Sequence, residues 1–423
     1  MSVFDRHLIF GDVAAVSLCP GGDPFACQAG AVYTFERIGD AWYQTQTIIP
    51  PDIGFLDGFG NSVAIDASNP NRFFTVTGGK LGQGIFGYGH IFEHDGEAWV
   101  EVARLPRPAE GGLGDYGSSI ALYGDTALVR QSDHIYRYRE VGGQWIHEQT
   151  LMRPPEVIGT GSFGTVGLTM HRDWVFIDAY RESSFALQHG SVLVYRREAD
   201  GTLEYVQRIL PPDLEGAEVT SVHFGRGVHF DGRTLAIGAP LAKRDHREQG
   251  VVYIYELDGD TWTLRQELVA SLAETEARLG AAVSVDGDWL VAGHLQVRLN
   301  EAFAFRRGAD GQWREVAVLR PSGGTAFPAQ FGWNVVLHEN WAVLGAHNEV
   351  PGGAAYAFDL DCILGTNPCP VDMDGDGQLT IFDYLAFQTA FGTGDLRADF
   401  DGDGELTIFD FLAFQTAFAE GCE

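Results

Sequence analysis

Basic residues are scarce in this sequence: 28 Lys and Arg stand against 58 Asp and Glu over 423 residues, a net charge of −30. Nucleic acids and anionic membrane surfaces are bound through basic faces, so neither is expected as a partner. Apolar runs are short, and none approaches the roughly 18 residues that a membrane-spanning helix needs. Residues 1–7 carry no signal-peptide pattern, and any leader is expected upstream of Met1, because the chain begins inside a repeat.

Recognisable catalytic motifs are also missing. The sequence has neither a Gly-x-Ser-x-Gly elbow nor His-Glu-x-x-His. Two strings imitate protein-kinase motifs, residues 159–166 and His171-Arg172-Asp173, but they lie too close together for a kinase and coincide with repeat positions. We interpret the 13 histidines as solvated residues of loops. A pair of carboxylates for glycoside hydrolysis stays open, because its members meet only in the fold.

What the sequence has in abundance is glycine (54) and phenylalanine (28), a mixture that favours many short strands joined by tight turns. A unit of about 50 residues recurs, and each copy begins with an aromatic residue or Leu followed by Gly. The six pairs are Phe59-Gly60, Tyr116-Gly117, Phe163-Gly164, Phe224-Gly225, Leu279-Gly280 and Phe331-Gly332. Residues 2–11 align without a gap on residues 284–293, which gives a seventh copy at the start of the chain.

Each unit is predicted to contain four antiparallel strands. A strand, a two-residue turn and a second strand follow each pair, as in residues 284–293 with Asp286-Gly287 at the turn. A third strand resembles Val-Tyr-x-Phe, and a fourth carries Trp with Leu or Ile six residues later, as in Trp262 and Leu268. Four strands about every 50 residues indicate a propeller blade. The seventh unit ends at Phe358 without a fourth strand, so we predict a mainly β chain with a seven-bladed β-propeller that has one thin blade.

The Phe-Gly start, together with Gly238-Ala239-Pro240 after the second strand, resembles the FG-GAP repeats of integrin α-subunit heads and of many secreted bacterial proteins. The resemblance covers residues 1–360. Such repeats often carry Asp-x-Asp-x-Asp-Gly calcium loops. Residues 1–361 contain none, so the propeller itself is not expected to bind calcium.

Two acidic loops mark the C-terminal part. Residues 362–423 hold 12 acidic side chains and one basic one, and residues 372–383 and 399–410 both read Asp-x-Asp-Gly-Asp-Gly-x-Leu-Thr-Ile-Phe-Asp. Carboxylates at positions 1, 3, 5 and 12, with a backbone carbonyl from position 7, form a ligand set for Ca²⁺. We therefore expect two Ca²⁺ ions, held by Asp372, Asp374, Asp376, Gln378 and Asp383, and by Asp399, Asp401, Asp403, Glu405 and Asp410. An amphipathic helix is predicted after each loop.

Two loop–helix units with Asp at position 12 resemble a dockerin module, and the ending Gly421-Cys422 resembles the dockerin variety that anchors secreted bacterial proteins. We place the propeller at 1–360, a linker at 361–370 and the module, small and α-helical, at 371–423. The resemblance implies a cohesin-like or cell-surface partner contacted at loop positions 10 and 11, which are Ile381, Phe382, Ile408 and Phe409. Packing of these four residues between the two helices is the alternative.

The five cysteines have no metal-type spacing. Cys19 could pair with Cys27 and Cys369 with Cys422, which would leave Cys362 over and indicate an extracellular or cell-surface location. Free thiols throughout are the alternative. From all of this we interpret the chain as a secreted, non-enzymatic and monomeric protein whose propeller binds a protein or glycan and whose module anchors it. The alternative is a polysaccharide-degrading enzyme with its active site on the propeller face.

Overall fold

The computed structural model describes residues 1–12, 30–38, 41–51, 58–77, 87–108, 116–159, 163–184, 188–212, 221–271, 275–294, 300–321, 330–346, 348–349, 353–363, 371, 373, 380–393, 398, 400 and 406–420. The chain divides into two compact units. One comprises Met1–Phe35 and Gln44–Phe358, and the other comprises Glu36–Tyr43 and Asp359–Glu423.

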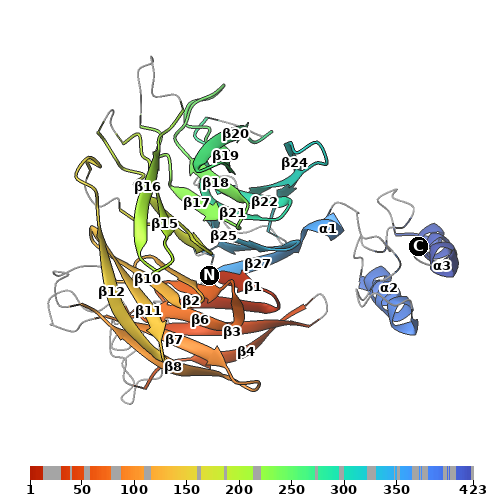
Figure 1. Cartoon of the computed structure of the whole chain (residues 1–423). Coiled ribbons are helices and arrows are strands. Elements are labelled where there is room, and N and C mark those ends of the chain that lie inside the picture. Colours follow the sequence, from red (N-terminus) through yellow and green to blue (C-terminus); the bar gives the residue numbers. More distant parts are fainter. Residues whose placement is uncertain are drawn as a thin grey trace. The chain divides into compact units, whose positions relative to one another are not determined.

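The first unit is built from seven antiparallel sheets that follow one another along the chain (Figure 1). The first four blades are β1 (Ser2–Phe4), β2 (His7–Asp12), β3 (Ala31–Ile38) and β4 (Ala41–Ile48); β5 (Val63–Asp66), β6 (Asn69–Val76), β7 (Tyr88–His94) and β8 (Trp99–Pro106); β9 (Ile120–Tyr123), β10 (Thr126–Gln131), β11 (His134–Val141) and β12 (Gln144–Met152); and β13 (Leu168–His171), β14 (Trp174–Asp178), β15 (Val192–Arg197) and β16 (Leu203–Ile209).

The last three blades complete the ring. They are β17 (Gly227–Phe230), β18 (Thr234–Ala239), β19 (Val251–Asp258) and β20 (Thr261–Leu268); β21 (Leu279–Asp286), β22 (Trp289–His294), β23 (Ala302–Arg307) and β24 (Trp313–Leu319); and β25 (Phe331–His338), β26 (Trp341–Ala346) and β27 (Ala354–Asp359). The prediction of a mainly β, seven-bladed propeller with one thin blade is confirmed, since the seventh sheet has three described strands and the others have four.

The first strand of each blade lies innermost, and the seven inner strands contact one another in a closed circle, in which β25 of the last blade touches β1 of the first. At this closure the rings of Phe4 and His338 are in contact, with their centres 4.3 Å apart and their planes tilted by 33°. Among the described residues, no strand is shared between the two blades. The ring is therefore closed by contacts between side chains of neighbouring blades.

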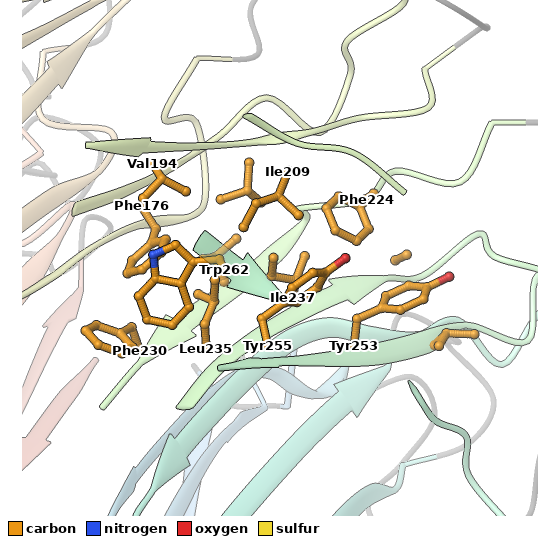
Figure 2. Packing of buried hydrophobic residues seen from close by; sticks show 14 of the residues in the cluster. Phe176, Val194, Ile209, Phe224, Phe230, Leu235, Ile237, Tyr253, Tyr255 and Trp262 are labelled. Carbon is orange, nitrogen blue, oxygen red and sulfur yellow. The ribbon is translucent and has the colours of Figure 1, made fainter. Parts of the chain in front are cut away.

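Aromatic side chains fill the space between neighbouring blades. Between blades 4 and 5, Trp262 meets Phe176 and Phe230 edge-on, with ring centres 5.0 and 5.2 Å apart (Figure 2). All three side chains are buried. Burying one such side chain stabilises a fold by about 1.5–3 kcal/mol. The constant spacing of aromatic residues in the repeats thus places large side chains between neighbouring blades.

Glycine at the end of the second strand allows neighbouring blades to approach closely. A Cβ atom on Gly238 would lie 1.8 Å from the carbonyl oxygen of Gly280 in the next blade, and one on Gly293 would lie 1.9 Å from that of Gly332. The glycine that ends the second strand therefore meets the glycine that begins the next repeat across each of these interfaces. This is a physical reason for their pairing in the sequence.

In the second unit, α1 spans Leu360–Ile363, α2 spans Ile381–Thr393 and α3 spans Ile408–Glu420. Helix α1 occupies the first residues of the segment expected to be a linker. Phe387 of α2 stacks on Phe414 of α3, with ring centres 4.1 Å apart and planes 6° apart, and Tyr384 packs beside them. Within the described residues, no helix is long and apolar enough to cross a membrane.

Candidate functional site

A cavity of about 270 Å³ lies in the channel at the centre of the propeller. All seven inner strands contribute to its wall, and the lining residues cluster toward the end of the channel where each inner strand turns into the second strand. The wall has two different sides. Blades 1–3 supply mainly apolar side chains, including Phe4, whereas blades 4–7 supply the titratable ones, which are His171, His229, Asp231, Asp286 and His338.

The closest pair of titratable groups in this wall is His338 and Asp286. Nδ1 of His338 lies 2.9 Å from Oδ2 of Asp286, which also accepts the backbone N–H of Glu339 at 2.7 Å. Burial acts to raise the pKa of Asp286, but the hydrogen bonds from His338 and Glu339 outweigh it and lower the pKa below its usual value. A carboxylate can only accept, so Nδ1 of His338 carries the proton and Nε2 remains as the basic nitrogen.

His229 is fixed in the opposite sense. Its Nδ1 accepts the backbone N–H of Val285 at 3.2 Å, so Nε2 carries the proton of the neutral ring and can donate a hydrogen bond. Burial lowers the pKa of His229, which keeps the ring neutral at physiological pH. The pKa of His171 is lowered mainly by burial too, and this ring packs 5.1 Å from Tyr123 and 5.9 Å from Phe230.

The same positions also join the blades. Asp66, Asp231 and Asp286 occupy equivalent places before the hairpin turn, and each accepts a backbone N–H from the next blade, at 2.7–3.0 Å. Ser2, His229 and Ser284 occupy the position two residues before this one in their blades. Each of them accepts a backbone N–H group of the next blade. The cavity's polar groups are therefore rigidly held by the ring itself. The described residues contain no cluster of three or more His, Cys, Asp or Glu that could hold a metal ion.

Treating the histidines as solvated loop residues was wrong for these three, which line the channel. His171 even belongs to the kinase-like string, whose placement at a hairpin turn is right. The signal was available in the sequence: within the repeat, the residue before the turn and the residue two positions earlier face the channel. This periodicity identifies channel-lining residues only after the repeats have been arranged as blades of a closed ring.

At the opposite end of the channel, three blades depart from the glycine rule. The position that is Gly11, Gly238, Gly293 or Gly345 in four blades is Val76 in blade 2, Arg130 in blade 3 and Asp178 in blade 4. The two charged side chains are buried. Asp178 accepts the N–H groups of Val166 and Gly167 through Oδ1, while its Oδ2 has no hydrogen-bond partner among the described residues. Burial raises the pKa of Asp178 to about 6.

Of the predicted calcium ligands, the structure describes Asp383 and Asp410, the two position-12 residues. Both are buried at the start of their helices. Asp383 accepts the N–H of Thr380, and Asp410 accepts those of Phe400 and Thr407, at 2.7–2.8 Å. The other proposed ligands, Asp372, Asp374, Asp376, Gln378, Asp399, Asp401, Asp403 and Glu405, lie outside the described residues, as do the disulfide candidates Cys19, Cys27, Cys369 and Cys422. Cys362 is exposed, near the end of α1.

The four residues expected to contact a partner are exposed: Ile381, Phe382, Ile408 and Phe409 each keep 62–64% of their surface accessible. They do not pack between α2 and α3, where the aromatic core of the module lies. Leu385 and Leu412, one helical turn further on, are half-exposed and extend the two apolar strips. Residues equivalent in the repeat thus form equivalent surfaces on the two helices.

Comparison with known proteins identifies the fold but no family. No protein-family description and no curated protein matches the sequence. Among solved structures, a candidate 6-phosphogluconolactonase of Bacteroides uniformis matches with a TM-score of 0.54 at 11% identity, over 84% of this chain and 95% of that one. A candidate 6-phosphogluconolactonase of Bacteroides fragilis (TM-score 0.42, 13% identity, 69% and 78% covered) and the periplasmic gluconolactonase of Pseudomonas aeruginosa (0.48, 14%, 84% and 97%) also match.

This chain is a seven-bladed β-propeller. The interpretation of the propeller as a non-enzymatic interaction protein is corrected, because the solved structure that matches with a TM-score of 0.54 is named as a candidate 6-phosphogluconolactonase, which is an enzyme. The channel holds a partly open cavity with a polar and an apolar side. The name of the matched structure favours the enzyme alternative, and the likeness itself, at 11% identity, shows the fold.

Proposed function

We propose that the propeller is a hydrolase that opens a small cyclic ester, such as a sugar lactone, in the central cavity. The observation that carries the proposal is the His338–Asp286 pair, 2.9 Å apart in the wall of that cavity. A cavity of about 270 Å³ suits a single sugar-sized ring better than a polymer. Its polar and apolar sides suit a ring with hydroxyl groups on one face. The names of the proteins that share the fold support the same class of substrate.

The proposed reaction uses water and two histidines. His338, held by Asp286, takes a proton from water through Nε2, and the hydroxide attacks the ester carbonyl carbon. The N–H of His229 donates to the oxyanion that forms on the carbonyl oxygen. The bond from this carbon to the ring oxygen then breaks, and His338 returns its proton to the leaving alkoxide. One water is consumed and one hydroxy acid is produced.

The test is proton release from D-glucono-1,5-lactone, corrected for spontaneous hydrolysis. We expect His338→Gln to lower kcat by a factor of at least 100, the lower end of what a general base contributes. Asp286→Asn should lower kcat in the same way. Asp66→Asn is the matched control, because Asp66 makes the same contact with the next blade at Gly124 but does not line the cavity. Equal losses in all three variants would assign the aspartates a purely structural role and reject the mechanism.

For the C-terminal module we propose Ca²⁺ binding and attachment to a cohesin-like or cell-surface partner outside the cell. The buried carboxylates of Asp383 and Asp410 fit the role of position-12 ligands, because each is fixed where its loop runs into the helix. When bound, the ion would tie the start of each loop to the helix that follows. The apolar strips at Ile381, Phe382, Ile408 and Phe409 support a partner surface, since exposed apolar groups of this size favour association. Replacing all four by Ser should abolish binding to an immobilised cohesin domain while leaving calcium uptake unchanged.

A further inference from the structure

A cluster of arginines lies at the end of the channel away from the hairpin turns, in a protein whose net charge is −30. Tyr180 and Arg181 follow the end of β14, and Arg226 comes directly before β17, so the strand directions bring them to the same end of the ring. The guanidinium carbons of Arg181 and Arg226 lie 5.1 and 5.6 Å from the ring centre of Tyr180. Within the described residues, neither arginine forms an ion pair with a carboxylate. A local positive potential in a strongly acidic protein favours a bound anion.

The surroundings of His223 also indicate a positive electrostatic potential at this place. Its ring lies 5.4 Å from that of Tyr180, and its Nε2 lies 2.8 Å from Oε1 of Gln188, to which it donates. Burial, and then the positive charges of Arg181, Arg226 and Arg278, lower the pKa of His223 to about 4. Arg278 is paired with Glu248, whereas Arg226 has only the charge of the buried Asp178 nearby, without a described ion pair. His223 is therefore a neutral ring, whose single N–H is donated to Gln188, beside two cations that form no described ion pair.

Flat aromatic faces complete the cluster. The guanidinium of Arg226 also lies 5.7 Å from the ring centre of Trp333, which comes from blade 7 on the other side of the channel mouth. Arg226 donates one described hydrogen bond, from Nη1 to the carbonyl of Ala281 at 3.3 Å, although a guanidinium has five N–H donors. Both Arg226 and Trp333 are partly exposed, so a ligand can reach them.

We propose that Arg181, Arg226, Tyr180, His223 and Trp333 form a binding site for an acidic sugar, that is, a sugar ring bearing a carboxylate or a phosphate group. The fork of Arg226 suits the planar pair of oxygens of such a group, and Arg181 adds charge. The partly exposed ring of Trp333 suits the C–H face of the sugar, while the buried Tyr180 holds the two guanidinium groups in place. This site lies at the other end of the channel from the proposed lactone cavity, and it does not depend on hydrolytic activity.

Isothermal titration of the full-length protein tests the proposal, with glucuronate, glucose 6-phosphate and glucose as probes. We expect at least one acidic sugar to bind at least 10-fold more tightly than glucose. Whether glucuronate or glucose 6-phosphate binds more tightly shows whether the site prefers a carboxylate or a phosphate group. Arg226→Gln and Arg181→Gln should each weaken that binding at least 10-fold, and raising the salt concentration should weaken it in the unaltered protein. Arg265→Gln is the control, because Arg265 is an exposed arginine of the outer strand β20 that pairs with Asp258.

Equal affinity for glucose and for both acidic sugars would overturn the proposal, as would full binding by a folded Arg226→Gln variant. If this variant does not fold, Arg226→Lys serves instead. It keeps the charge but not the planar fork, and the proposal requires at least a 3-fold weaker affinity. If inorganic phosphate bound as tightly as the acidic sugars, the cluster would hold an adventitious ion only, and the proposal of a sugar site would be rejected.

Discussion

The side-chain amide of Gln266 hydrogen-bonds both backbone groups of Trp313 in the next blade, donating to its carbonyl and accepting its N–H, each at 2.8 Å. The arrangement recurs between Gln207 and Trp262, and between Gln46 and Trp99. Gln149 makes the same pair of bonds to Leu203, which replaces the tryptophan. In each blade concerned, the glutamine lies four residues after the Trp or Leu position of its own outer strand. The outer rims of successive blades are therefore joined by a repeated two-bond contact.

We expect Gln266→Ala to lower the free energy of unfolding by about 1–3 kcal/mol, because it leaves two half-buried backbone groups of Trp313 without their partner. Denaturant unfolding monitored by tryptophan fluorescence measures the change. Gln144→Ala is the control, since Gln144 is exposed at the start of β12. A loss of the same size in both variants would mean that the two-bond contact contributes nothing particular.

The glycine at the end of the second strand gives a second prediction. Gly238→Ala should destabilise the propeller by more than about 3 kcal/mol, beyond the usual range for an overpacked site, because its Cβ would meet the backbone of Gly280. Gly345 occupies the same position in blade 7, but its nearest neighbour would be Cβ of Asn334 at 3.6 Å. Gly345→Ala should change the free energy of unfolding by less than about 1 kcal/mol. Comparable destabilisation by the two substitutions would refute the close-approach explanation.

The fold was predictable because its periodic elements have a physical cause that the sequence repeats. Pairs such as Phe224-Gly225 recur because an aromatic side chain is buried between blades, and the glycine of Gly238 recurs at Gly11 and Gly293, where two backbones approach closely. The Trp-x-x-x-Gln pattern was equally visible but was not interpreted, because the partner of the glutamine is a backbone group that carries no signal of its own. Thinness of the seventh blade followed directly from the missing fourth strand.

The candidate site could be predicted far less well. His338 and Asp286 are 52 residues apart in different blades, and only the packing of blades around the ring places them 2.9 Å from each other. Arg226 and Trp333 meet across the channel for the same reason. Arg130 and Asp178 were the one detectable sign, since they put charged side chains at a position that is Gly or Val in the other blades, and a broken local rule often marks a functional or strained position. The non-enzymatic interpretation failed because motif searches detect only sites that are local in sequence.

Asp178 should make stability depend on pH. Its carboxyl is fully buried, and the pKa is raised to about 6 from an ordinary value of 3.8. The contribution of a raised pKa is fully present below the unfolded value and is lost as pH rises through the folded value. Ionisation at pH 8 therefore costs about 3 kcal/mol, from a difference of roughly two pKa units. Asp178→Asn, which keeps an oxygen for the N–H groups of Val166 and Gly167, should raise the Tm at pH 8 and have little effect at pH 4. A gain of equal size at both pH values would refute this cause.

Calcium removal should affect the two units differently, and the sequence supplies a separate probe for each. Eight of the nine tryptophans lie in the first unit, so tryptophan fluorescence reports mainly on the propeller, whereas α2 and α3 give the main helical signal near 222 nm. The two loops gather eight aspartates, whose mutual repulsion without a cation opposes folding. In the full-length protein, chelation should therefore abolish the helical transition and leave the fluorescence Tm within about 2 °C, because only a state that binds the ion is stabilised by it. Asp383→Asn with Asp410→Asn should reproduce the effect of the chelator in the presence of calcium. A chelator-induced fall of several degrees in the fluorescence Tm would instead place a calcium site in the propeller, where no Asp-x-Asp-x-Asp-Gly loop exists.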